Sequence, residues 1–202
     1  MHFSTIFTTT ALAGAVFAAD HKVAVGTQSG ELIFKPDSVQ AAEGDTVTFR
    51  FWPKNHSVAQ AAFANPCQPM ARGFWSGYVP TTNTQAVANE TFTYTVTNAS
   101  APVWFYCTQG QHCQAGMVGV INPPQTGART LDAFKNASKQ ATANVAPSST
   151  AGTGGNLTTN GTSTSGSASS SGSSPASTGA ASHLTGSATF AGLTGLAAYL
   201  LL

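Results

Sequence analysis

The stretch of sequence that decides the fold is WFYCTQGQHCQAGMVGVI, residues 104–121. It holds a thiol at Cys107, an imidazole at His112 and a thioether at Met117 in one short loop between two apolar runs. A loop of this size can fold three donors back toward one point, which a rigid helix could not. A thiolate, two imidazoles and a weak, distant thioether are the ligands of an electron-transfer copper site. The stretch therefore predicts a mononuclear copper centre with Cys107, His112 and Met117 among its ligands.

The second histidine of that centre must come from elsewhere in the chain. His56 is the expected ligand, because it follows a predicted strand at residues 46–51 and lies in a polar loop. The alternative interpretation makes His56 an ordinary histidine of a surface turn. Zinc is a rival metal, since it also accepts cysteine and histidine, but it has little use for a thioether. Met117 therefore favours copper.

The cysteine count leaves two disulfide pairings open. The chain has 3 cysteines, and an odd number in a secreted protein leaves one thiol free or engaged. If Cys107 is the copper thiolate, Cys67 and Cys113 remain to form a disulfide, which closes a loop of about 45 residues and stabilises by roughly 3–4 kcal/mol. The rival pairing of Cys107 with Cys113 would destroy the ligand set.

The composition indicates a secreted and processed protein. Only 7% of the residues are charged and the formal net charge is +1, so no basic excess exists to neutralise nucleic-acid phosphates. Residues 1–19 are mostly apolar and end in VFAA, which predicts a signal peptide cleaved after Ala18 or Ala19. A membrane-spanning helix is disfavoured there because the apolar part is too short.

The other end of the chain carries a second processing signal. Residues 183–202 end in an apolar tail that follows small residues and a polar spacer. This order is the signal for a glycolipid (GPI) anchor, with attachment predicted at Ser177, Gly179 or Ala180. A transmembrane helix is the rival interpretation, but the tail is short and has no basic cytoplasmic flank. We therefore expect an extracellular protein that reaches the plasma membrane only through a lipid anchor, or that resides in the cell wall.

Residues 125–182 read as a connecting stalk. A short helix is predicted around residues 128–139, and no Lys, Arg, Asp or Glu follows from Gln140 onward. Residues 146–182 are mostly Ser, Thr, Gly and Ala, and such a segment buries too little apolar area to offset the entropy of ordering, which predicts disorder there. In a secreted chain such a segment is typically O-glycosylated. A bare flexible linker is the alternative.

Between the processed ends, residues 20–124 predict one all-β domain. Runs rich in β-branched and aromatic residues alternate with breakers such as the EGD at residues 43–45. The predicted strands are residues 23–26, 32–34, 46–51, 91–96, 103–106 and 117–121. Many short strands in about a hundred residues suggest an antiparallel Greek-key sandwich or barrel.

Sequons for N-glycosylation occur along both the domain and the stalk. Asn55 begins one of them but precedes His56, where a glycan would crowd the metal, so we expect it to be unmodified. The remaining candidates are Asn89, Asn98, Asn136, Asn156 and Asn160.

The copper loop resembles that of phytocyanins, the plant blue copper proteins. A closer resemblance is to fungal extracellular serine-rich, cupredoxin-like proteins, and it spans about residues 23–124. The motifs that carry it are NHSVAQ at residues 55–60, NPC at 65–67, GFWSGY at 73–78, WFYC at 104–107 and HCQAGMVGVINP at 112–123. The resemblance implies a cupredoxin fold, a Cys67–Cys113 disulfide and copper held by His56, Cys107, His112 and Met117.

Three classes of function follow from these residues. The leading hypothesis is a non-enzymatic, monomeric cell-surface protein with one type 1 copper, which transfers electrons to an unidentified partner. Apolar neighbours at Trp52, Trp104 and Phe105 are expected to limit solvent access to the metal. The alternative is a copper-binding or structural cell-wall glycoprotein without a dedicated redox partner. An enzyme is disfavoured, because a multicopper oxidase needs His-x-His pairs and a copper monooxygenase needs a terminal histidine, for which His21 would require unusual cleavage.

Overall fold

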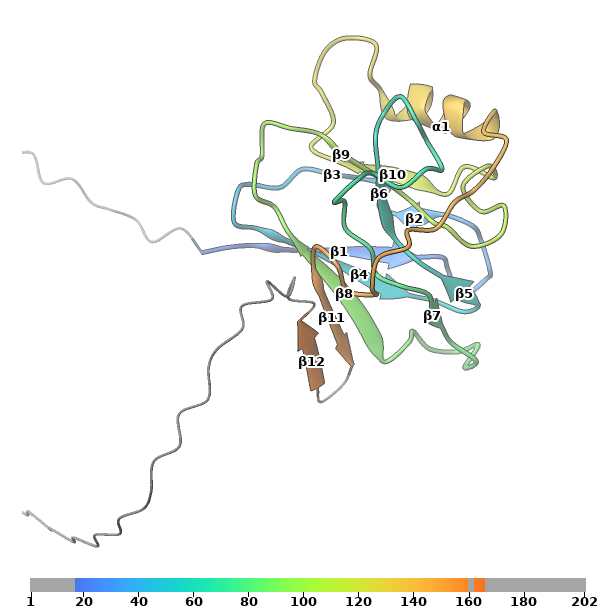
Figure 1. Ribbon diagram of the computed structural model, residues 1–202. Coiled ribbons are helices and arrows are strands. Elements are labelled where there is room, and N and C mark those ends of the chain that lie inside the picture. Colours follow the sequence, from blue (N-terminus) through green and yellow to red (C-terminus); the bar gives the residue numbers. More distant parts are fainter. Residues whose placement is uncertain (1–16, 160–161, 166–202) are drawn as a thin grey trace, which may run out of the picture. The chain divides into compact units, whose positions relative to one another are not determined.

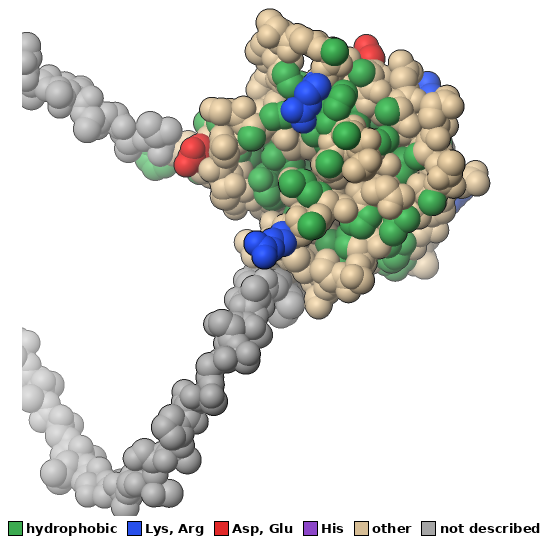
Figure 2. Space-filling view, turned by 45° about the horizontal axis from the view of Figure 1, so that its top comes forward, with side chains coloured by type: hydrophobic (Ala, Val, Ile, Leu, Met, Phe, Trp, Pro, Cys, Tyr) green, Lys and Arg blue, Asp and Glu red, His purple; other side chains and the backbone are tan. Residues whose placement is uncertain are grey.

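The computed structural model describes residues 17–159 and 162–165 (Figure 1). The predictions for residues 1–16, for the sequon at Asn160 and for the anchor sites Ser177, Gly179 and Ala180 lie outside the described residues. Within the described part of the chain, no helix is long and apolar enough to cross a membrane. Uncharged side chains dominate the face drawn in Figure 2, as the low content of charged residues requires.

Two β-sheets pack against each other as a sandwich (Figure 1). The larger sheet has six strands in the order β12-β11-β8-β4-β1-β2, and the smaller has four in the order β3-β10-β9-β6. A third, two-stranded sheet pairs β5 with β7. The bounds are β1 Asp20–Val25, β2 Phe34–Lys35, β3 Ser38–Val39, β4 Thr46–Phe51, β5 Asn55–His56, β6 Ala59–Ala61, β7 Val79–Pro80, β8 Glu90–Thr95, β9 Val103–Tyr106, β10 Val118–Ile121, β11 Asn156–Thr159 and β12 Thr162–Ser165.

Phenylalanine rings from both sheets fill the space between them. On β4 the residues alternate, so that Val47, Phe49 and Phe51 are buried while the residues between them are not. Phe49 lies 5.3 Å from Phe105 of β9 and 6.3 Å from Phe92 of β8, measured between ring centroids. These contacts join the two sheets into one core that extends to the predicted copper ligands Cys107 and Met117.

The all-β prediction is confirmed. Each of the six predicted strands is found, with ends shifted by at most a few residues. The strands β3, β5, β6 and β7 were not predicted, because a strand of two or three residues has too few positions to show an alternating pattern. The strands β11 and β12 were not predicted either, because they lie in the Ser/Thr-rich segment that was expected to be disordered.

The smaller sheet is buried on both faces, which requires a second covering layer. All residues of β9 and β10 are buried, although a sheet covered on one side would expose alternate positions. The cover is helix α1, Leu131–Lys139, which begins at the N-cap Thr130. Its Phe134 is fully buried and lies 4.8 Å from Trp104 between ring centroids.

The chain beyond Pro124 belongs to the folded domain for most of its described length, so the predicted boundary at that proline is too early. We call residues 125–159 the C-terminal strap. After α1 it forms main-chain hydrogen bonds with Trp75 at Gly152 and Thr153, and its β11 pairs with β8. The average composition of this segment is polar, but it contains a few apolar residues, chiefly Phe134. These residues pack the segment against the outer face of the smaller sheet.

Asp45 ties the start of β1 to the loop before β4. One carboxylate oxygen accepts a hydrogen bond from the Ala19 N–H at 2.8 Å, and the other accepts from the Ala42 N–H at 2.9 Å and lies 3.0 Å from Nε2 of His21. These contacts, with that of His21 the largest, lower the pKa of the buried Asp45 from 3.8 to about 2.

This shift predicts a pH dependence of stability. Because the folded state favours the carboxylate, the contribution of Asp45 is fully present above pH 3.8 and is lost as the pH falls toward about 2. Urea midpoints measured across this range should therefore fall more steeply for the wild type than for Asp45→Asn. Parallel curves for the two proteins would contradict the assignment.

Candidate metal centre

The structure brings His56, Cys107 and His112 together at one end of the sandwich. His56 ends β5, Cys107 directly follows β9, and His112 lies in the loop that leads to β10. The Cys107 Sγ lies 3.9 Å from Nδ1 of His56 and 3.4 Å from Nδ1 of His112. One donor atom from each residue lies within 4.8 Å of the other two, which is close enough for a single ion to contact all three.

Met117 closes the ligand loop. Its N–H donates to the His112 carbonyl at 3.0 Å, and its carbonyl accepts from the Cys107 N–H at 3.1 Å. Its side chain is fully buried in the same core as Cys107. The residue that carries the predicted thioether is therefore held by one main-chain hydrogen bond to Cys107 and one to His112.

The protonation states suit a soft metal. Burial lowers the pKa of His56 to about 4, and burial also lowers the pKa of His112, so both imidazoles are neutral and free to bind at neutral pH. Burial raises the pKa of the Cys107 thiol, while N–H groups of Gln109 and Ser57 oppose that effect by favouring the thiolate. Only a metal that binds thiolate strongly can displace this proton, and copper does so. The donor set fits copper.

Ser57 is a functional residue that the sequence analysis missed. Its hydroxyl lies 3.8 Å from the Cys107 Sγ, accepts a hydrogen bond from the Thr108 N–H at 2.9 Å, and lies 2.8 Å from the Thr108 hydroxyl. All three residues are buried. Ser57, directly after His56 at the end of β5, thus connects this segment to Cys107 and Thr108 directly after β9. Its sequence position next to His56 was the available signal.

Two further residues fix His56. Gly26, at a φ of 76°, lies so close that an added Cβ would be 2.6 Å from Nε2 of His56, so only glycine fits. Asn55 donates from its amide nitrogen to the side-chain oxygen of Gln109 at 2.9 Å, which links the two ligand loops. An N-glycan on that same nitrogen would have to fit between the two ligand loops beside Gln109, so we still expect Asn55 to be unmodified.

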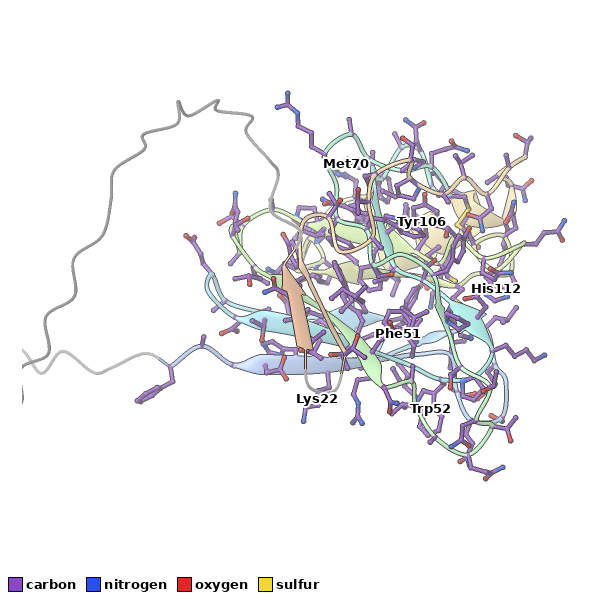
Figure 3. All side chains as sticks on the ribbon, turned by 60° about the horizontal axis from the view of Figure 1, so that its bottom comes forward. Lys22, Phe51, Trp52, Met70, Tyr106 and His112 are labelled. Carbon is purple, nitrogen blue, oxygen red and sulfur yellow. A yellow bond between two sulfur atoms is a disulfide. The ribbon has the colours of Figure 1, made fainter. Side chains whose placement is uncertain are left out.

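The predicted apolar surroundings are only partly correct. Phe105 lies in the core with Cys107, but Trp104 points to the opposite face of β9 and packs under α1, because neighbouring strand residues alternate. Trp52 is half-buried and lines a hollow on the outer face of the large sheet together with Lys22. Figure 3 shows Trp52 and Lys22 on the side of the large sheet that faces away from Tyr106.

The structure contains the predicted disulfide. Cys67 and Cys113 are bonded with a Cα–Cα distance of 5.7 Å, and Cys107 is the one unpaired cysteine among the described residues. The bond anchors the residue next to His112 to the segment before Trp75. His21 lies apart from the site and contacts Asp45.

Comparisons with known proteins identify the family of this chain. Residues 21–122 match the family of copper-binding proteins described as the plastocyanin/azurin family. A protein of Arthroderma benhamiae named "Probable GPI-anchored cupredoxin-1" is 36% identical over 143 residues, which is 71% of this chain and 72% of that protein. A second protein of the same organism, "Extracellular serine-rich protein", is 36% identical over 135 residues, covering 66% of this chain and 50% of its own length.

Solved structures with a similar fold include oxidised plastocyanin of Dryopteris crassirhizoma. It is 23% identical, with a TM-score of 0.34 over 50% of this chain and 96% of that one. A pseudoazurin of Hyphomicrobium denitrificans is 18% identical, with a TM-score of 0.36 over 61% and 98% of the two chains.

The chain belongs to the plastocyanin/azurin family of copper-binding proteins, the cupredoxins. The predicted resemblance to fungal serine-rich and GPI-anchored cupredoxins is confirmed. Cupredoxins bind copper and typically carry electrons rather than catalyse reactions.

Proposed function

We propose that this protein is a cell-surface electron carrier with a single type 1 copper. His56, Cys107 and His112 would form the trigonal plane, and Met117 would be the weak axial ligand. Bound copper would supply one-electron chemistry by alternating between Cu(I) and Cu(II). The observation that carries the proposal is a buried thiol with two neutral imidazoles within 4.8 Å, on a loop that also contains a buried thioether.

The protein's own part in this chemistry is to hold the donors still. His56, Cys107 and Met117 are buried, and the hydrogen bonds of Ser57 and the main chain of Met117 keep the thiol in place. A site that changes little between two oxidation states exchanges electrons with little reorganisation. His112 is the least buried of the three clustered donors and gives the electron a route to the surface.

A copper titration tests the proposal. Full-length secreted protein, freed of metal and titrated with Cu(II), should develop an intense visible band that saturates at one equivalent. A thiolate bonded to Cu(II) produces such a band by charge transfer, whereas nitrogen and oxygen ligands alone do not. Copper binding without this band would favour the alternative role, a copper-binding wall glycoprotein with no redox partner.

We also propose that the protein is held at the cell surface by a GPI anchor at Ser177, Gly179 or Ala180. The name of the cupredoxin relative, "Probable GPI-anchored cupredoxin-1", supports this proposal. Treatment of cells with a phosphatidylinositol-specific phospholipase should release the protein into the medium. Protein that stays with the membrane after this treatment would contradict the anchor, and protein that needs wall digestion for release would place it in the cell wall.

A further inference from the structure

The C-terminal strap contacts the ligand loop directly at Asn144. The side-chain amide of Asn144 donates to the Cys107 carbonyl at 3.1 Å and to the Gly110 carbonyl at 3.0 Å. Asn144 lies beyond residues 21–122, the part matched to the copper-binding family. A residue outside the matched domain therefore bridges both ends of the turn that leads from Cys107 toward His112.

With the contact from Asn144, all three main-chain polar groups around Cys107 have a hydrogen-bond partner: its N–H, its carbonyl and the N–H of Thr108. The N–H of Cys107 donates to Met117, its carbonyl accepts from Asn144, and the next N–H, of Thr108, donates to the hydroxyl of Ser57. The peptide between Cys107 and Thr108 is thus fixed at both its oxygen and its nitrogen. The orientation of this peptide sets the direction of the Cys107 side chain.

The neighbouring residue anchors Asn144 itself. The Val145 N–H donates to the Cys67 carbonyl at 2.9 Å, and the Val145 carbonyl accepts from the Tyr106 hydroxyl. Cys67 is bonded through its sulfur to Cys113, the residue after His112. The strap therefore contacts the chain immediately before Cys107 and the disulfide immediately after His112.

The chemistry of the contact requires an amide. One NH2 group has two N–H donors and can serve two carbonyls at once, whereas a carboxylate has none. The same requirement fixes the orientation of the amide, since a flipped side chain would set its oxygen against two carbonyl oxygens. The Asn144 Oδ1 has no hydrogen-bond partner among the described residues, so the side chain is held through its NH2 group alone.

We propose that Asn144 is a positioning residue for the copper centre, which it serves by fixing the Cys107 peptide and the Gly110 turn. This inference rests on the proposed function. Partners one step removed from a metal typically change metal affinity 10- to 100-fold when they are lost. The strap is then part of the metal site and not only the connection to the stalk.

The test compares Asn144→Asp with Asn136→Asp in the full-length protein, made in a host that adds no N-glycans. Asn136 is exposed on α1, and no side-chain hydrogen bond is found for it among the described residues. The first readout is amide hydrogen exchange of the copper-free protein at His112 and Met117, whose N–H groups bond within the loop. The second is the rate at which a chelator removes copper. In Asn144→Asp the two amides should exchange faster and the rate of copper removal should rise about tenfold, and in Asn136→Asp neither rate should change.

The outcomes separate this inference from the proposed function. If Asn144→Asp lowers the Tm but leaves loop exchange and copper release unchanged, Asn144 is only a structural contact and the inference is overturned. If the wild type binds no copper, the proposed function fails, while the exchange readout still decides whether Asn144 orders the loop. If Asn144→Asp does not fold, Asn144→Ala removes the same donors without adding charge and must give the same two increases.

Discussion

Cys107→Ser is expected to abolish the intense visible band of the copper-loaded protein. The band requires a thiolate, and a hydroxyl neither ionises at neutral pH nor donates charge to copper at visible energies. The Cys107 side chain is fully buried, so a serine there occupies the same space without exposing the site to solvent. The measurement is the absorption spectrum during a Cu(II) titration, with the wild type titrated in parallel.

Two variants serve as controls for this loss of colour. Met117→Gln keeps the thiolate and should stay blue, but with a lower reduction potential, because an amide oxygen favours Cu(II) more than a thioether does. His21→Ala should leave the colour unchanged, since His21 contacts Asp45 outside the site. A visible band that persists in Cys107→Ser would remove the type 1 assignment altogether.

Phe134→Ala should have the largest effect on stability among single changes in the strap. The Phe134 ring is fully buried and lies 4.8 Å from Trp104 and 5.9 Å from Phe63, measured between ring centroids. Removing a buried phenylalanine side chain typically costs about 3–5 kcal/mol of unfolding free energy. Urea unfolding of the oxidised, copper-free protein measures this loss without interference from the metal.

Lys139→Ala is the matched control on the same helix. Lys139 is exposed at the last turn of α1, so its replacement should change the unfolding free energy by no more than about 0.5 kcal/mol. An equally small effect of Phe134→Ala would mean that α1 does not cover the sheet in solution.

The grouping of the candidate metal ligands could be predicted from the sequence because most of them are local. Cys107, His112 and Met117 lie on one loop, and their chemistry alone indicates copper. His56 could be predicted from its place after a strand and from the resemblance. The spacing of Cys107, His112 and Met117 within one loop was therefore enough to predict most of the candidate site.

The supporting residues could not be predicted, because each acts on a partner far away in the chain. Ser57 contacts a residue 50 positions away, and Asn144 contacts one 37 positions away. No periodicity or motif signals such a pair. The strap was missed for a related reason, since one buried ring at Phe134 is invisible in a composition dominated by small polar residues.

The position of the strap has a consequence for the order of folding. The outer face of β9 and β10 gains its cover only when Phe134 has been synthesised, and β8 gains β11 still later. Until then a chain that is still being synthesised exposes the Trp104 ring and the unpaired edge of β8. Exposed apolar side chains and unpaired strand edges promote the aggregation of partly folded chains. The sheets also depend on contacts between distant residues, such as the parallel pairing of β1 with β4, and such topologies fold slowly. Folding is therefore expected to finish only after the whole strap has been synthesised and has docked on the two sheets.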